Sequence, residues 1–183
     1  MTELAETITS SKRLYDGRII NLRLDTVLLP NGKAGQREIV EHRGAVAMVP
    51  VLGRDTVILV RQYRGAAGRA LLEIPAGTRD HDEDVEACAR RELAEEINFA
   101  AGRMMELYQA FVAPGYSTEL IHTFLALDLS PVEGHTDEDE FLEVVRLPLA
   151  EAISKIGTGE IQDSKTISGL LFAARRLEEM GGQ

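Results

Sequence analysis

The chain has 183 residues, of which 44% are apolar, and its formal net charge is −10 at pH 7. This length suits one domain, or one domain with a modest extension, while the negative charge argues against DNA or RNA as a partner because a phosphate backbone would be repelled. No apolar run approaches the ~20 residues of a membrane span, and no basic-then-apolar signal sequence is found, so we expect a cytoplasmic protein.

The predicted elements alternate between strands and helices. Strand-like runs of apolar and β-branched residues occupy 11–15, 19–28, 37–42, 45–52, 57–62, 71–74, 108–112, 120–127 and 142–147. Turns are predicted at Asn31-Gly32 and at Gly53-Arg54-Asp55. Helices are expected from about Asp82–Glu83, from Pro148 to Ile156, and from a cap at Asp163 or Ser164. This order favours an α/β fold in which helices flank a mixed sheet.

The most informative segment runs from Gly77 to Phe99 and reads GTRDHDEDVEACARRELAEEINF. In a helix, Glu92 lies one turn from both Glu95 and Glu96, where like charges cost roughly 0.2–0.5 kcal/mol per pair. Glu92 and Glu96 also continue the apolar stripe on which Cys88 lies, a cysteine that we expect in the core, and no basic residue shares that stripe. A charged surface helix is the alternative, but carboxylates on a buried stripe predict a bound divalent metal.

The spacing of this segment resembles the Nudix box, the motif of Nudix hydrolases. Five residues separate Gly77 from Glu83, seven separate Glu83 from Arg91, and the run Arg91–Glu96 reads RELAEE. One position departs from the family pattern, because Asn98 stands where the family usually has Gly. That position is expected to end the helix in a left-handed conformation, where Asn is second to Gly, so the change costs on the order of 1 kcal/mol and removes no ligand.

Other segments resemble the ADP-ribose pyrophosphatase branch of this family. They are GRIINL and REIVEH near the N-terminus, RQYR at 61–64, LLEIPAG at 71–77, APGYSTE at 113–119 and HTDEDEFLEVV at 135–145. The resemblance implies an α/β/α sandwich with a mixed sheet and an N-terminal antiparallel strand arm. It divides the chain into an arm at 1–43 and a hydrolase domain at 44–183, and it implies a homodimer whose arms are exchanged between subunits.

The resemblance also implies a metal centre and a general base. Two or more Mg²⁺ ions, or Mn²⁺ in their place, would be held by Ala76 through its carbonyl and by the side chains of Glu92, Glu95, Glu96 and Glu140. Arg91 would orient these carboxylates, and Glu83 would brace the motif loop. Catalysis would rest on Arg91, Glu92, Glu96 and Glu138. Glu138 would act as the base, although another acid of 137–140 could take that role, and an acidic run of this kind is usually a solvated loop.

Seven residues outside the metal centre match substrate contacts of the family. They are Ile19, Arg37, Glu38, Arg64, Thr78, Gly115 and Glu119. Ile19 would contact the adenine, Arg64 would clamp the diphosphate, and Arg37 and Glu38 would reach the site of the partner subunit. The alternatives are a solvated arginine at 64, a solvated strand surface at 37–38 and an ordinary hairpin connection at 113–119.

The activity expected from this resemblance is Mg²⁺-dependent hydrolysis of ADP-ribose to AMP and ribose 5-phosphate. Another nucleoside diphosphate derivative, such as a nucleotide sugar, is the alternative substrate. A non-catalytic ADP-ribose sensor is the alternative from a different functional class. The expected partners are the small-molecule substrate and a second copy of the chain, with no nucleic acid and no membrane.

Overall fold

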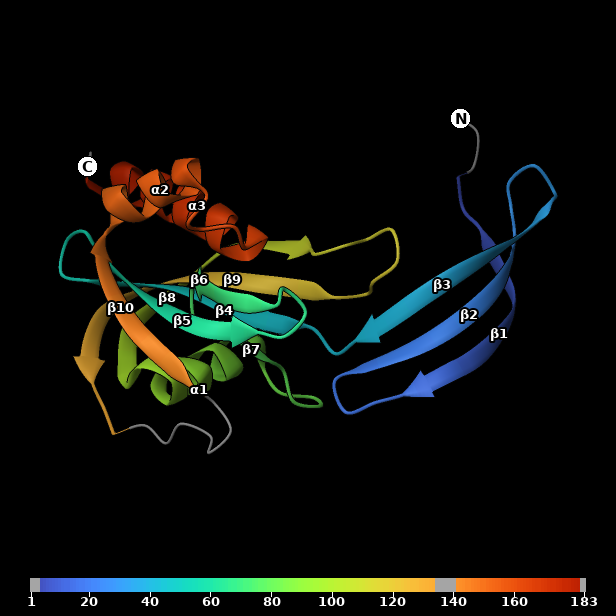
Figure 1. Cartoon of the computed structure of the whole chain (residues 1–183), viewed down its shortest axis with the longest axis horizontal. Coiled ribbons are helices and arrows are strands. Elements are labelled where there is room, and N and C mark those ends of the chain that lie inside the picture. Colours follow the sequence, from blue (N-terminus) through green and yellow to red (C-terminus); the bar gives the residue numbers. More distant parts are fainter. Residues whose placement is uncertain (1–3, 134–140, 182–183) are drawn as a thin grey trace. The chain divides into compact units, whose positions relative to one another are not determined.

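The computed structural model describes residues 4–133 and 141–181, and the chain forms two compact units (Figure 1). The first unit comprises residues up to 44 together with 110–120, and the second comprises 45–109 and the chain from 121 onward. Within the described ranges, no helix has both the length and the apolar composition needed to cross a membrane.

The first unit is built on a three-stranded antiparallel sheet in the order β1 (Thr7–Asp16), β2 (Ile20–Leu28) and β3 (Ala34–His42). The predicted Asn31-Gly32 turn joins the last two strands, and Gly32 has a φ of 80°, which glycine adopts without strain. Every residue of β1 is exposed, so this strand forms an open edge of the small sheet.

The segment 110–120 belongs to the first unit because it bonds to β3. The Val40 N–H donates to the Tyr116 carbonyl at 2.8 Å, and the Thr118 N–H donates to the Val40 carbonyl at 3.0 Å. The His42 N–H also donates to Oγ1 of Thr118 at 3.0 Å. The sequence-based division at residue 43 assigned residues 110–120 to the hydrolase domain. No local pattern in the sequence indicates the hydrogen bonds of this segment to β3.

The second unit contains a seven-stranded mixed sheet. Its strands are β4 (Ala45–Leu52), β5 (Thr56–Arg64), β6 (Arg69–Glu73), β7 (Ala76–Thr78), β8 (Phe99–Phe111), β9 (Leu120–Pro131) and β10 (Leu142–Pro148). The order is β10-β5-β4-β9-β8, with β6 paired to β5 and β7 paired to β4. The pair β4–β9 is parallel, whereas β4–β5 and β5–β10 are antiparallel, which confirms the predicted mixed sheet.

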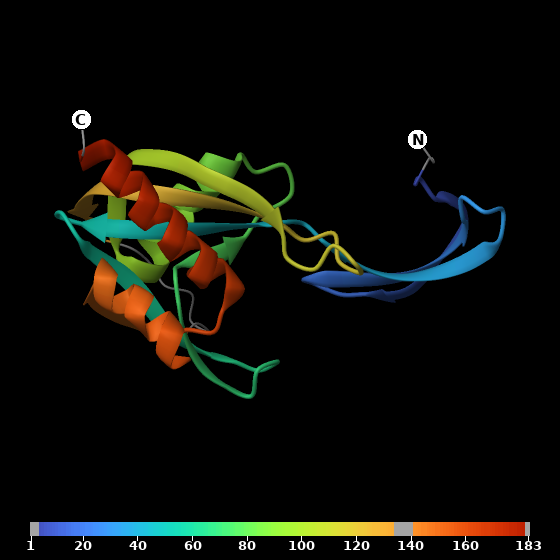
Figure 2. The same ribbon diagram turned by 90° about the horizontal axis from the view of Figure 1, so that it is seen from above.

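Helices cover both faces of this sheet. The helix α1 (Val85–Ile97) lies on one face, and α2 (Leu149–Thr158) and α3 (Ser164–Gly181) lie on the other (Figures 1 and 2). The α/β/α sandwich implied by the Nudix resemblance is therefore confirmed.

The alternation of side chains along β4 explains why the sheet is buried on both faces. Ala47 and Val49 belong to the core beneath α2 and α3, whereas Val46 and Met48 belong to the core beneath α1. All four side chains are fully buried. A continuous apolar run is what a strand covered on both faces requires, because successive side chains point to opposite faces.

Several strand and helix boundaries differ from the sequence-based prediction, and two of them concern the motif helix and the strand that follows it. The strand β8 begins at Phe99, whereas the prediction began it at 108. The first half was missed because the run at 100–107 contains Gly and Met and shows no clear alternation of apolar and polar residues. The helix α1 begins at Val85 instead of Asp82–Glu83, because Asp84 keeps an extended backbone and acts as the N-cap.

Candidate active site

The termini of α1 are both closed by local hydrogen bonds. Oδ1 of Asp84 accepts from the Ala87 N–H at 3.0 Å, which satisfies one of the unpaired donors of the first turn. At the other end, Asn98 has φ 58° and ψ 41°, and its N–H donates to the Ala94 carbonyl. The predicted left-handed Asn98 cap is confirmed, so the departure from the Nudix box leaves the helix end intact.

The carboxylates of Glu92 and Glu96 lie inside the protein. Glu92 is 9% exposed and Glu96 is 4% exposed, and they share the buried face of α1 with Cys88 and Leu93. Burial raises the pKa of the Cys88 thiol to about 12, so this residue packs as a neutral core side chain, as expected. The predicted position of the two glutamates on the inward stripe is confirmed.

The first glycine of the motif makes room for one of these carboxylates. A methyl group on Gly77 would lie 1.9 Å from the Cδ atom of Glu92, well inside van der Waals contact. Gly77 belongs to β7, so the Glu92 carboxylate packs directly against the backbone of this strand. The spacing between Gly77 and Glu92 thus has a direct steric basis.

The second buried carboxylate bonds to the same short strand. The Ala76 N–H donates to Oε2 of Glu96 at 3.0 Å, and the Pro75 carbonyl accepts from the Met48 N–H at 2.9 Å. The Pro75–Gly77 turn is therefore held between α1 and β4. Ala76 lies next to the carboxylates as the resemblance implied, and its role as a metal ligand stays a prediction.

Arg91 connects the motif acids. Its Nε and Nη2 donate to the two carboxylate oxygens of Glu83 at 3.0 Å each, and its Nη1 lies 2.7 Å from Oε2 of Glu95. The same Nη1 lies 2.9 Å from Oε1 of Glu92. The apolar stripe of α1 contains no basic residue, but the Arg91 side chain reaches the Glu92 carboxylate from outside that stripe. The hydrogen bonds from Arg91 lower the pKa of Glu83 to about 2.

The acids of α1 can supply only some of the oxygen ligands of a magnesium ion. In residues 4–133 and 141–181, no group of three or more His, Cys, Asp or Glu side chains is arranged to hold a metal. Mg²⁺, however, usually takes only one or two carboxylates and completes its shell with water and substrate phosphates. Glu92 and Glu96 supply two buried oxygen ligands one helical turn apart, so the residues present fit that ion.

Arg64 has a partner that the sequence analysis did not identify. It is the last residue of β5, and its Nε and Nη2 donate to Oε1 and Oε2 of Glu73 at 3.0 and 2.8 Å. Glu73 is 1% exposed. The sequence feature that could have indicated this ion pair is Glu73 within the apolar run Leu71–Ile74, because a buried carboxylate needs a cation nearby.

The predicted substrate residues are divided between the two units. In the second unit, Thr78 is exposed at the end of β7. In the first unit, Glu38 and Gly115 are exposed, Arg37 bonds to Glu6, and Oε1 of Glu119 lies 4.0 Å from Nδ1 of His42. The structure brings Ala76, Arg91, Glu92, Glu95 and Glu96 together, whereas Glu138 and Glu140 lie outside the described residues.

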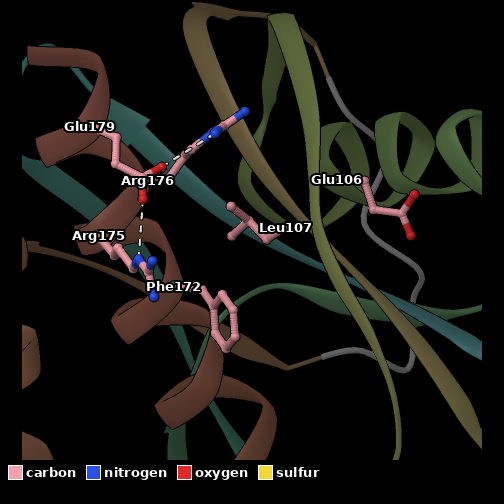
Figure 3. Close-up of a pocket in the computed structure, with 6 residues that line it drawn as sticks. All are labelled: Glu106, Leu107, Phe172, Arg175, Arg176 and Glu179. Atoms are coloured by element: carbon pink, nitrogen blue, oxygen red, sulfur yellow. Dashed lines mark hydrogen bonds and ion pairs between the residues drawn. The ribbon is translucent and has the colours of Figure 1, made fainter.

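Ile19 lines a pocket of about 280 Å³ within the first unit, together with residues that include Arg18, Asn21 and His42. A pocket of about 300 Å³ in the second unit is lined by Phe172, Leu107 and charged residues of α3 and β8 (Figure 3). Its arginines, Arg175 and Arg176, both bond to Glu179. None of the predicted site residues that the structure describes lines this second pocket, so it is not the candidate active site.

Comparison with known proteins agrees with this geometry. Residues 41–170 match the NUDIX domain, and residues 6–40 match the nucleoside diphosphate sugar hydrolase N-terminal domain. The chain is 39% identical to an ADP-ribose pyrophosphatase of Bacillus subtilis (strain 168), with 94% of each chain covered. It is 40% identical to an ADP-ribose pyrophosphatase of Mycobacterium tuberculosis (strain ATCC 25618 / H37Rv), with 91% of this chain and 81% of that one covered.

Two further similarities were found. The chain is 36% identical to a GDP-mannose pyrophosphatase of Citrobacter koseri (strain ATCC BAA-895 / CDC 4225-83 / SGSC4696), with 88% of this chain and 91% of that one covered. A crystal structure of an ADP compounds hydrolase superposes with a TM-score of 0.86 at 28% identity, over 96% of both chains. The matched domain includes Gly77, Glu92 and Glu96 in the arrangement described above. The chain therefore belongs to the Nudix hydrolase family and is a Nudix pyrophosphohydrolase.

Proposed function

We propose that this protein hydrolyses the pyrophosphate bond of ADP-ribose and releases AMP and ribose 5-phosphate. The observation that carries the proposal is the pair of buried carboxylates, Glu92 and Glu96, packed against the Ala76–Gly77 backbone. Relatives named ADP-ribose pyrophosphatase that match more than nine-tenths of the chain support the choice of substrate.

Nudix hydrolases generally use a divalent metal ion. For this chain we propose two or more Mg²⁺ ions, or Mn²⁺ in their place, with ligands from Ala76, Glu92, Glu95, Glu96 and Glu140. When bound, such an ion would neutralise phosphate charge and acidify a coordinated water. Glu92 and Glu96 are suited to this role because they are oxygen ligands already withdrawn from solvent, so little solvation is lost when they bind a cation.

The chain's own residues divide the remaining work. Arg91 bonds to Glu83, Glu92 and Glu95 and so holds two of the proposed ligands in place. Glu138 would accept a proton from the attacking water, a contribution typically worth ~10²–10⁴ in rate. The water oxygen would bond to one phosphorus while the bond from that phosphorus to the bridging oxygen breaks, and the bridging oxygen would leave with the other product.

Substrate recognition is proposed to involve residues from both units. Arg64 in the second unit would bind the diphosphate and Ile19 in the first would contact the adenine. Thr78, Gly115 and Glu119 would make further contacts with the substrate. Arg37 and Glu38 would act in the site of a partner subunit. The roles of Arg37 and Glu38 require a homodimer, which we propose together with a cytoplasmic location.

A nucleotide sugar is the second candidate substrate. The match of residues 6–40 to a nucleoside diphosphate sugar hydrolase N-terminal domain and the similarity to a GDP-mannose pyrophosphatase both favour it. The two candidates share the metal centre and the diphosphate, so they differ only in the group beyond the second phosphate and in the base.

The test is incubation of the protein with Mg²⁺ and a panel of nucleoside diphosphate derivatives that includes ADP-ribose and GDP-mannose, followed by product identification. We expect AMP release from ADP-ribose with kcat/KM at least about tenfold above the other substrates, and a kcat lowered about 10²-fold or more in the Glu92→Gln variant. A higher kcat/KM for GDP-mannose would reverse the assignment. Binding of ADP-ribose without turnover would indicate a sensor instead.

A further inference from the structure

A second group of charges lies in the second unit, outside the motif. Glu73 is the last residue of β6 and is 1% exposed, although it carries a carboxylate. Burying one ionised carboxylate is costly unless cations and hydrogen bonds compensate for the lost solvation. Two cations do so here, Arg64 from the end of β5 and Lys165 from the first turn of α3.

The contact between Arg64 and Glu73 fixes the plane of the guanidinium. Both carboxylate oxygens of Glu73 accept from it, which is the bidentate geometry that gives arginine its directional binding. Nη1 of Arg64 has no hydrogen-bond partner among the residues that the structure describes, and the side chain is 40% exposed. One edge of the guanidinium is therefore held by the protein while another edge is open to a ligand.

Glu73 itself is held from the opposite side. Lys165 Nζ donates to Oε2 of Glu73 and lies 2.9 Å from Oδ2 of Asp163. The backbone next to Glu73 is also anchored, because the Ile74 N–H donates to Oγ1 of Thr166 at 2.9 Å. Although burial raises it, the bonds and charges of Arg64 and Lys165 bring the pKa of Glu73 below its ordinary value, so it stays ionised near neutral pH.

This cluster adjoins the candidate metal carboxylates. Glu73 precedes the Ala76 N–H that bonds to Glu96 by only three residues. The hydrogen bond with Glu73 is the largest cause of the raised pKa of Arg64, and the negative charges of Glu96 and Asp163 contribute to it. Arg64 therefore experiences the negative charge of Glu96, one of the proposed metal ligands.

We propose that Glu73 is a positioning residue, which holds the Arg64 guanidinium so that its open edge binds a phosphate of the nucleoside diphosphate substrate. The inference rests on the proposed function. A free arginine side chain has many rotamers, and a guanidinium ordered before binding loses less conformational entropy when the substrate arrives. Glu73 acts through Arg64 alone and does not touch the substrate.

A double-mutant cycle with ADP-ribose and Mg²⁺ tests this assignment. Glu73→Gln is expected to raise KM about tenfold while kcat stays within about threefold, because it weakens binding that is equal in the ground and transition states. In an Arg64→Ala background, adding Glu73→Gln should change KM by less than about twofold, since the group that Glu73 positions is already absent. Independent effects that multiply in the double variant would overturn the proposal.

Two further variants keep the test decisive if Glu73→Gln does not fold. If Glu73→Gln does not fold, Arg64→Lys leaves Glu73 in place but cannot form the bidentate contact. We expect its KM to match that of Arg64→Ala, and a wild-type KM would overturn the proposal. The matched control is Glu160→Gln, which removes the negative charge 2.9 Å from Lys155, outside the site, and should leave KM unchanged.

The two proposals fail in different ways. A wild-type protein that does not hydrolyse ADP-ribose contradicts the proposed function, and the same cycle is then run with whichever panel substrate is hydrolysed. An active wild type whose KM is unaffected by a folded Glu73→Gln contradicts only the role of Glu73. Circular dichroism melting of every variant separates loss of binding from loss of fold.

Discussion

At the residue scale, burial distinguishes the acids of α1. Glu92 and Glu96 are nearly inaccessible, whereas Glu86 on the same helix is half exposed and forms an ordinary i,i+4 pair with Arg90. Buried carboxylates one turn apart repel each other, and a protein that retains them gives up stability that an amide would restore. The functional argument for these two glutamates therefore rests on their burial as much as on the motif.

Glu92→Gln and Glu96→Gln should each lower kcat by on the order of 10²-fold or more, because each removes a proposed metal ligand. Thermal stability should stay equal or rise, since one buried negative charge is gone. The measurements are turnover of ADP-ribose with Mg²⁺ and thermal melting. Glu86→Gln is the control on the same helix and should keep full activity. Near-normal turnover by both buried variants would exclude the metal assignment.

The general base is predicted within the acidic segment that lies outside the described residues. Glu138→Gln should lower kcat about 10²–10⁴-fold while leaving substrate affinity nearly unchanged, since proton removal matters only in the transition state. Single-turnover kinetics together with equilibrium binding separates the two quantities. The same behaviour from Glu140→Gln instead would move the role of base to that neighbouring acid.

Glu83 gives a prediction for pH dependence. Because the hydrogen bond with Arg91 lowers the pKa of Glu83 from 4.5 to about 2, its contribution to stability is complete above pH 4.5 and is lost as the pH falls toward 2. Wild type should exceed Glu83→Gln by roughly 1–2 kcal/mol at pH 7, after allowance for solvent screening. Urea unfolding between pH 7 and pH 3 should show this difference shrinking below about pH 4.5; a constant difference would refute it.

At the element scale, the contact between β7 and α1 sets the geometry of the carboxylates. The strand supplies Gly77 against Glu92 and the Ala76 N–H against Glu96, while the helix ends normally at Asn98. The strand β7 therefore positions both carboxylates of α1, one by steric contact and the other by a hydrogen bond. The Gly77 contact involves the far end of a side chain, so crowding it affects the carboxylate before it affects the fold.

Gly77→Ala should consequently impair activity more than stability. Its methyl group would meet the Glu92 carboxylate at 1.9 Å and displace it, while the rest of the side chain can adjust. We expect the Mg²⁺ concentration for half-maximal activity to rise about tenfold or more, a size seen when metal-ligand geometry is disturbed. Gly65→Ala, at a position with open space, is the control. An unchanged Mg²⁺ requirement would contradict the contact.

At the scale of the whole molecule, the residues assigned to the proposed function are divided between two units. The acids proposed to bind metal belong to the second unit, whereas Arg37 and Glu38 belong to the first. A homodimer in which each first unit serves the partner's site would explain why a strand-rich segment with a fully exposed β1 accompanies the sandwich. Closed two-fold symmetry would then give two equivalent sites per dimer.

Subunit complementation tests this arrangement. Arg37→Ala and Glu92→Gln should each have little activity alone. After the two variants are unfolded and refolded together, half of the dimers are mixed and hold one intact site, so about a quarter of wild-type activity should return. Light scattering should give twice the mass of one chain for every variant. Activity no higher than the sum of the separate variants would show that each site is complete within one chain.

Much of the fold and part of the site could be predicted because their signals are local. The apolar run of β4, the period that places Glu92 and Glu96 on the inward face of α1, and the left-handed cap at Asn98 each depend on residues within a few turns or strands. The strand β8 was partly missed because its first half lacks alternation.

The sequence by itself determined that carboxylates would lie on a buried helix face, since helical periodicity needs no knowledge of the rest of the chain. Only the tertiary structure decided what those carboxylates touch. Gly77 and Glu92 belong to one motif, but its spacing does not show that the glycine makes room for the carboxylate. Glu73 lies between Arg64 and Lys165, which share no local pattern with it. Such contacts exist only once packing of α1 and α3 on the sheet has brought the segments together, and they decide how the motif residues are held.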